Sequence, residues 1–125
     1  MEQDNRIRDF TDLIVWQRAH VLVMSVYSVS KEFPDEERFA LTDQTRRAAV
    51  SITSNIAEGF GRRSTKDKSH FYNIALASLY EVRNQLIVAR DLKYIDPNVY
   101  KDVYHHAMDA QKVLAAFIKS TKEMS

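Results

Sequence analysis

The hydrophobic positions of this sequence recur at three- and four-residue steps, and no stretch shows the strict alternation of a half-buried strand. This period predicts four helices, over residues 12–32, 43–58, 65–92 and 97–122, and no strand. Phe33-Pro34 ends the first helix, because the residue before a proline disfavours helical torsion angles. Asp96-Pro97 starts the fourth, as an N-cap followed by proline at the first helical position. Ser64 or Thr65 is a candidate N-cap for the third, and Asp67 stands three residues after Ser64 in capping-box register.

Three of these helices show one apolar face that we expect to be buried. The faces are Leu13, Trp16, His20, Val23 and Tyr27 in the first helix, Phe71, Ala75, Leu79, Val82 and Leu86 in the third, and Val103, Ala107, Ala110, Leu114 and Phe117 in the fourth. Ala19, Val21, Leu22 and Val26 widen the face of the first helix. His20 belongs to the first series, so we expect it to be a core histidine rather than a metal ligand.

The second helix differs from the others because it has no charged side chain between Arg47 and Glu58. Thr42 is its candidate N-cap, and Gly59 stands where the helix would end. Its stripes are Thr45, Ala49, Ile52 and Ile56, then Val50 with Ala57. A helix that is apolar or small on several faces must be buried on several faces. We therefore expect it to lie at the centre of a bundle or against another subunit.

Short links between helices of these lengths predict an all-α, antiparallel up-down-up-down four-helix bundle. It would form a single domain over residues 12–122, preceded by a polar lead over residues 1–11. The absence of cysteine excludes disulfides and thiolate chemistry. The first residues are unlike a signal peptide, and no apolar run is long enough to span a membrane. These features predict a cytoplasmic protein without a membrane partner.

Polar side chains follow the apolar stripes of the second and third helices. They are Gln44, Ser51, Asn55 and Glu58 on the second, and Ser78, Glu81 and Gln85 on the third. One interpretation is a buried hydrogen-bond network that fixes the register between helices or subunits. The other is a ligand pocket lined by Glu58 and Glu81. We favour the structural network, because two carboxylates without a histidine or metal partner are a poor active-site signal.

The sequence gives no pattern for catalysis or for a bound cofactor. His105 and His106 are adjacent, so on a helix they point about 100° apart and cannot chelate together. Gly59-x-Gly61 lacks the third glycine and the preceding strand of a dinucleotide-binding loop. We expect no enzyme, no catalytic residue, no cofactor and no metal.

Basic residues gather where the second and third helices join. The candidate nucleic-acid-binding residues are Arg62, Arg63, Lys66 and Lys68, with Arg46 and Arg47 near the other end, where acidic residues can pair with them. A net charge of +1 gives no global argument, so the case rests on this clustering. Two interpretations are open: the cations are solvated and complement the C-terminus of a helix, or they contact phosphates. No interleaving of aromatic and basic residues suggests base stacking.

Four stretches carry a family pattern. They are Phe10-x-x-Leu13-x-Val15-Trp16-Gln17-x-Ala19, Phe33-Pro34-x-Glu36, Leu41-x-x-Gln44-x-Arg46-Arg47-Ala48-x-x-Ser51-Ile52-x-x-Asn55-Ile56-Ala57-Glu58-Gly59-x-Gly61-Arg62, and Phe71-x-x-Ile74-Ala75-x-x-Ser78-Leu79-x-Glu81. Together they resemble the "four helix bundle protein" family, also called the S23 or 23S rRNA intervening-sequence protein family. The resemblance covers most of residues 9–95, and the fourth helix matches only in pattern.

The resemblance implies an antiparallel four-helix bundle that assembles as a homo-oligomeric ring, a pentamer, in bacterial cytosol. Some relatives are encoded inside insertions in large-subunit ribosomal RNA genes. A structurally similar group, the accessory variability determinant proteins of diversity-generating retroelements, pairs with a reverse transcriptase and binds nucleic acid. The family has no settled activity, so no catalytic residue is carried over.

Two hypotheses from different classes follow. In the first, a homo-oligomeric ring binds RNA or DNA through its basic rim without reading sequence, as an accessory to a reverse transcriptase or in association with rRNA intervening sequences. In the second, the ring is a protein-interaction scaffold whose charged ends dock a partner.

Overall fold

The computed structural model describes residues 6–124 of the chain. Its four α-helices are α1 (Ile14–Ser30), α2 (Leu41–Phe60), α3 (Thr65–Asp91) and α4 (Pro97–Glu123). Two short 3-10 helices, η1 (Phe10–Asp12) and η2 (Asp35–Glu37), precede α1 and α2. Within residues 6–124 there is no strand, so the predicted all-helical class with four helices is confirmed.

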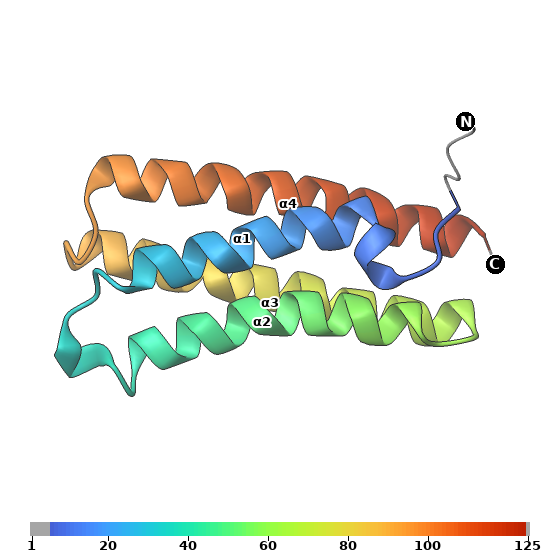
Figure 1. Ribbon diagram of the computed structural model, residues 1–125, viewed down its shortest axis with the longest axis horizontal. Helices are drawn as coiled ribbons and strands as arrows, with labels where there is room; N and C mark the ends of the chain where they lie inside the picture. Colours follow the sequence, from blue (N-terminus) through green and yellow to red (C-terminus); the bar gives the residue numbers. More distant parts are fainter. Residues whose placement is uncertain (1–5, 125) are drawn as a thin grey trace.

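The helices lie side by side, and the chain reverses direction from each one to the next (Figure 1). α1 contacts α2 and α4, and α3 also contacts α2 and α4. Among the described residues α1 does not contact α3, and α2 does not contact α4. The N-terminal segment, the α2–α3 turn and the end of α4 therefore share one end of the molecule (Figure 1). We call it the basic end for the cations described below.

The core lies between the four helices and is almost entirely aliphatic. Each helix places a row of side chains in it: Leu22 and Val26 from α1, Ile52 and Ile56 from α2, Leu79 and Val82 from α3, Val103 and Leu114 from α4. Of the two predicted stripes of α2, Thr45, Ala49, Ile52 and Ile56 are buried in full, whereas Val50 is exposed and Ala57 half-buried. Thr45 satisfies its hydroxyl by donating to the Leu41 carbonyl at 2.7 Å. No helix in the described part of the chain is long and apolar enough to cross a bilayer.

The predicted buried face of α1 is confirmed at Ala19, Leu22, Val23 and Val26 and wrong at His20, Val21 and Tyr27. The core residues of α1 are Val15, Ala19, Leu22, Val23, Val26 and Val29. His20 is exposed and stacks on the ring of Trp16 at 4.7 Å, so it is not a core histidine. Tyr27 is exposed as well. Small and β-branched side chains let α1 approach two neighbours closely, whereas the amphipathic rings cover the rim of the core.

Two of the predicted helix ends are confirmed and two are wrong. Ser64 Oγ accepts from the Asp67 amide at 3.1 Å, and Asp96 Oδ1 accepts from the Asn98 amide at 2.8 Å. Thr42, by contrast, lies inside α2, whose N-cap is Ala40. Gly59 also lies inside α2, which continues to Phe60. Both residues are buried, so tertiary packing rather than local capping determines their positions.

A single chain covers α2 on one side only. Gln44, Arg47, Val50, Ser54 and Glu58 are exposed along its outer surface. The burial on several faces that the sequence predicts is therefore not supplied by the chain itself.

Candidate nucleic-acid interface at the basic end

The candidate interface is built on the turn that joins α2 to α3. Only residues 61–64 separate the two helices, so the last carbonyls of α2 lie beside the first turn of α3. Such carbonyls have no partner within their own helix. The positively charged side chains of this turn can therefore either donate hydrogen bonds to the last carbonyls of α2 or project into solvent.

Lys68 donates hydrogen bonds to the last carbonyls of α2. Its Nζ donates to the Phe60 carbonyl at 2.8 Å and to the Gly59 carbonyl at 3.4 Å, and it lies 5.5 Å from the centre of the Phe60 ring. The side chain is half-buried. It completes the C-terminus of α2 from the first turn of α3, which stabilises the turn and leaves little of the cation for a ligand.

Arg62 is exposed, but it also has partners within the chain. One of its Nη atoms pairs with Glu58 Oε1 at 2.7 Å, and its guanidinium lies 4.5 Å from the centre of the Phe71 ring. The carboxylate offsets its charge, and the ring fixes its position. Arg62 thus contributes less to the outward field than its exposure alone suggests.

Arg63 and Lys66 project into solvent. Both are exposed, and neither makes a hydrogen bond or an ion pair within residues 6–124. The predicted cluster is therefore divided into two engaged cations, Arg62 and Lys68, and two available ones.

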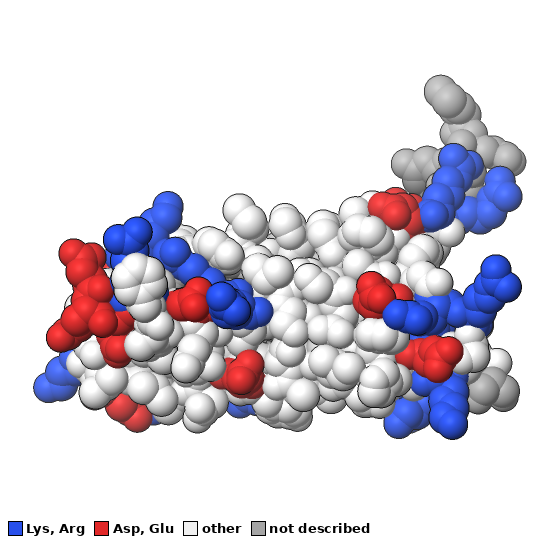
Figure 2. Space-filling model, turned by 90° about the horizontal axis from the view of Figure 1, so that it is seen from below, with Lys and Arg blue, Asp and Glu red and all other residues white. Residues whose placement is uncertain are grey.

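Further cations lie at the same end. They come from the N-terminal segment and from the end of α4: Arg6, Arg8, Lys119 and Lys122. Figure 2 shows basic side chains clustered around this end with a few acidic ones between them. At the opposite end, which we call the mixed end, acidic and basic side chains lie among one another (Figure 2). The charge of the molecule is therefore uneven, with cations in excess at the basic end and no matching excess of acids opposite.

Arg46 and Arg47 do not belong to this cluster. Fifteen residues of helix separate Arg47 from Arg62, which is about 22 Å at 1.5 Å per residue. Arg46 Nε donates to Ser30 Oγ at 2.8 Å, and Arg47 Nε pairs with Asp43 at 3.1 Å. Both arginines therefore lie near the opposite end, beside α1, and are not part of the cluster at the α2–α3 turn.

The predicted polar network, which we call the polar ladder, connects α2 to α3 at one point. The Oγ atoms of Ser51 and Ser78 are 2.8 Å apart, and Asn55 Nδ2 donates to the Ser51 carbonyl at 2.8 Å and to Ser51 Oγ at 3.0 Å. Gln85 is buried, and its Oε1 has no hydrogen-bond partner among the described residues. This small network fixes the register of α2 against α3.

The remaining ladder residues, Gln44, Glu58 and Glu81, are exposed and hydrogen-bond to no other member of it. The Ser51–Ser78 contact places Glu58 toward the start of α3 and Glu81 toward its end. Their axial separation is therefore about ten residues, or about 15 Å. The two carboxylates do not line a common pocket.

The sequence analysis did not predict the contacts between cations and aromatic rings at this turn. Phe60 lies under Lys68 and Phe71 lies beside Arg62, each across the α2–α3 turn. The only sequence signal is a spacing of eight or nine residues that spans a helix end, which no periodic pattern detects. Within residues 6–124 no group of three His, Cys, Asp or Glu side chains could hold a metal ion.

Residues 11–116 match the model of a protein family described as "23S rRNA-intervening sequence protein". The match begins within η1 and covers the four α-helices, up to two turns before the end of α4. The chain belongs to this family. No curated protein matches the chain.

A solved structure of this family resembles the chain over most of its length. It is a protein of unknown function from the S23 ribosomal protein family of Bacteroides thetaiotaomicron. The match has a TM-score of 0.78 and 24% sequence identity, and covers 85% of this chain and 96% of that one. At this identity the likeness shows that the two proteins share a fold.

Proposed function

We propose that this 23S rRNA-intervening sequence family protein is a non-enzymatic, homo-oligomeric antiparallel four-helix bundle that binds RNA or DNA through its basic end. The observation that carries the proposal is the pair Arg63 and Lys66, exposed cations that no carboxylate of the described chain neutralises. Such side chains can contact phosphates without breaking a hydrogen bond or an ion pair of the folded chain.

The proposed mode of binding is independent of sequence. Two aromatic rings beside these cations, Phe60 and Phe71, are half-buried and already contact Lys68 and Arg62, which does not favour stacking on a base. Side chains that reach only the phosphates fix position and affinity but do not read bases.

Assembly as a ring, which is part of the proposal, would strengthen such binding. One copy offers few free cations, but cyclic symmetry would repeat Arg63 and Lys66 around one rim and add their fields. The family description favours RNA as the first ligand to test. The resemblance to the accessory proteins of diversity-generating retroelements makes single-stranded DNA the second, with a reverse transcriptase as the protein partner.

The test is a fluorescence titration against a structured RNA and a single-stranded DNA at two salt concentrations. The test variant carries Arg63→Glu and Lys66→Glu. We expect it to lose most of the affinity and to lower the slope of log affinity against log salt by about two for each copy in contact. The matched control carries Arg38→Glu and Lys101→Glu, which reverse the same charge on exposed residues at the mixed end.

Two results would contradict the proposal. One is the absence of binding by the wild-type protein at low salt. The other is an equal loss of affinity in the test and control variants, which would mean that net charge alone, and not the basic end, determines binding.

A second candidate is a scaffold for a protein partner, and Phe39 favours it. This side chain is 85% exposed on the turn after η2, with only the Arg38 guanidinium beside its ring. If a protein partner docks there, it should co-purify with the wild-type chain after nuclease treatment. Phe39→Ser should abolish this co-purification, whereas the variant with Arg63→Glu and Lys66→Glu should leave it unchanged.

A further inference from the structure

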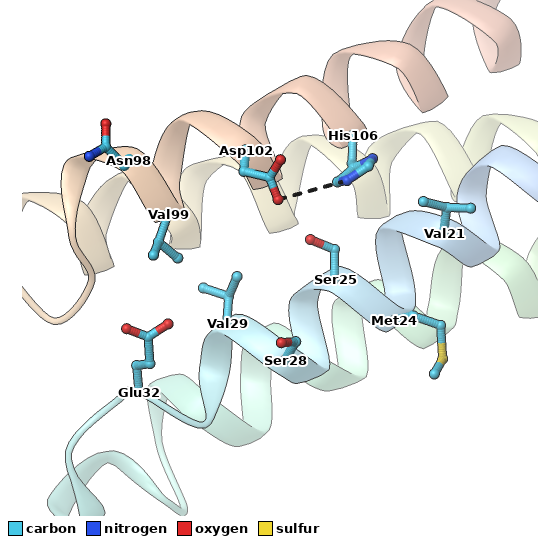
Figure 3. Close-up of a pocket in the computed structure, with 10 residues that line it drawn as sticks. All are labelled: Val21, Met24, Ser25, Ser28, Val29, Glu32, Asn98, Val99, Asp102 and His106. Carbon is cyan, nitrogen blue, oxygen red and sulfur yellow. Dashed lines mark ion pairs between the residues drawn. The ribbon is translucent and has the colours of Figure 1, made fainter.

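Two grooves of similar size lie on either side of α1. The first, between α1 and α4, has a volume of about 630 Å³ (Figure 3). Val21, Met24 and Val29 supply apolar surface from α1, and Glu32, Asp102 and His106 supply polar groups from the end of α1 and from α4. His106 Nε2 and Asp102 Oδ2 are 3.9 Å apart. We call it the acidic groove.

The second groove, between α1 and α2, has a volume of about 590 Å³. Its lining includes Tyr27 from α1 and Arg46, Arg47, Val50 and Ser54 from α2. Asp43 is the one carboxylate in that lining, and it pairs with Arg47. We call it the arginine groove. Cations exceed anions in it, whereas the reverse holds in the acidic groove.

The two grooves lie at the same level along the bundle. Arg46 contacts Tyr27 and Ser30, so Val50, one turn further along α2, lies level with Met24, one turn back along α1. The acidic groove uses the same stretch of α1, from Val21 to Glu32. The apolar parts of the two grooves therefore lie at matching heights.

The charges match in height as well. Arg18 pairs with Asp109, so Asp102, seven residues before it on α4, lies level with Ser25. Arg47 lies level with about Tyr27, so it differs in height from Asp102 by about 3 Å. The Arg47 side chain is 80% exposed, which lets it reach beyond its own Asp43.

We propose that these two grooves are the two halves of one contact between copies of this chain. The α2 wall of the arginine groove in one copy packs against the acidic groove of the next, with Arg47 facing Glu32 and Asp102. Val50, 40% exposed, then meets Met24, 58% exposed. This proposal rests on the ring assembly of the proposed function, and it names the surfaces that the ring uses.

The arrangement of the grooves determines the shape of the assembly. They lie on adjacent faces of a four-helix bundle, so their outward directions differ by roughly a right angle. A rotation about an axis parallel to the helices keeps heights unchanged and brings one groove against the other. Repeated contacts at such an angle close a ring of about four or five parallel copies, with α1 facing the central axis.

A second copy fits the arginine groove better than a nucleic acid does. The stretch of α2 from Ala48 to Ala57 carries no charge, and the exposed α1 side chains Val21 and Met24 are apolar. Phosphates gain nothing from such surface, and the carboxylates of the neighbouring acidic groove repel them. Protein–protein contact gains from both the apolar centre and the charged border.

The first test uses disulfide cross-linking, because the chain has no cysteine of its own. The test variant carries Arg47→Cys and Asp102→Cys. Since α2 and α4 do not touch within the described chain, any disulfide must join two copies. We expect oxidation to give a ladder of covalent oligomers that stops at the closed ring and so counts its subunits. The control carries Glu81→Cys with Asp102→Cys and should give no ladder.

The second test reverses charge at the contact. Arg47→Glu and Asp102→Arg should each raise the dissociation constant of assembly at least about tenfold, and the double variant should restore it. Arg90→Glu is the matched control, because Arg90 is also an exposed arginine with a local partner, Asp91 at 2.9 Å. Sedimentation velocity measures all four.

Each outcome decides one of the two proposals. A wild-type protein that is monomeric at all concentrations refutes ring assembly, and this contact with it. An oligomer that gives no ladder and is unchanged by Arg47→Glu refutes this contact but leaves ring assembly intact. Weaker RNA binding by Arg47→Glu with an unchanged oligomer assigns the groove to nucleic acid, which also overturns the contact.

Discussion

Gly59→Ala should destabilise the protein, although alanine is the better helix former. A Cβ atom at Gly59 would lie 2.5 Å from Tyr72 Cε1, 2.9 Å from Tyr72 Cδ1 and 3.1 Å from Phe71 Cβ. Tyr72 cannot move aside easily, because its side chain is fully buried and its ring packs 4.8 Å from that of Phe117. The added methyl group must therefore push α2 and α3 apart near the basic end.

The magnitude follows from two opposing contributions. Replacing glycine by alanine inside a helix favours folding by about 1 kcal/mol. Overpacking a tight core contact typically costs about 1–3 kcal/mol, and a 2.5 Å approach to an immobile ring belongs at the upper end. We expect a net loss of about 1–2 kcal/mol, which lowers the melting temperature by about 4–8 °C for a domain of this size.

The assay is thermal and urea unfolding followed by circular dichroism, with two comparison variants. Gly61→Ala is the matched control, because the nearest atom to its new Cβ is the Glu58 carbonyl oxygen at 3.6 Å and its φ is −76°. It should be neutral or slightly stabilising. In a double-mutant cycle, Tyr72→Leu should relieve part of the Gly59→Ala penalty. If Gly59→Ala is as stable as Gly61→Ala, the close approach of the two helices is not as described.

Other variants test the core, the turn and one ionisable group. Ile56→Asp buries an unpaired charge, costs several kcal/mol and should abolish the helical signal, so a wild-type melting curve would contradict the packing of α2. Lys68→Met removes the hydrogen bonds to the end of α2 and should cost about 1–2 kcal/mol while leaving nucleic-acid affinity within twofold. Burial raises the pKa of Tyr72, so stability should fall as pH rises above about 10, and Tyr72→Phe should weaken that fall in urea titrations.

The helical architecture could be predicted from sequence because it depends on local rules. The spacing of apolar residues gave the four helices, and side-chain caps gave the starts of α3 and α4 at Ser64 and Asp96. Thr42 and Gly59 show the limit of the same rules. Each has the residue type of a helix end, yet each is buried inside α2, because contacts with other helices outweigh the local preference.

The composition of the basic end could be predicted, but its division into engaged and available cations could not. Arg62, Arg63, Lys66 and Lys68 are close in sequence, and a pattern treats them alike. In the folded chain Lys68 reaches the end of α2, and Arg62 lies between Glu58 and Phe71. Which cation meets a carbonyl or a ring depends on how two helix ends approach each other across a turn.

By itself, the sequence determined the family, the helical period and the location of charge along the chain, because these are properties of residue order. Only the tertiary structure decided that His20 and Tyr27 of α1 lie outside the core, which cations remain available, and that the acidic and arginine grooves share one level. The reason is geometric: these features join residues from different helices, and the register between helices is fixed by packing and by single contacts such as Ser51 with Ser78.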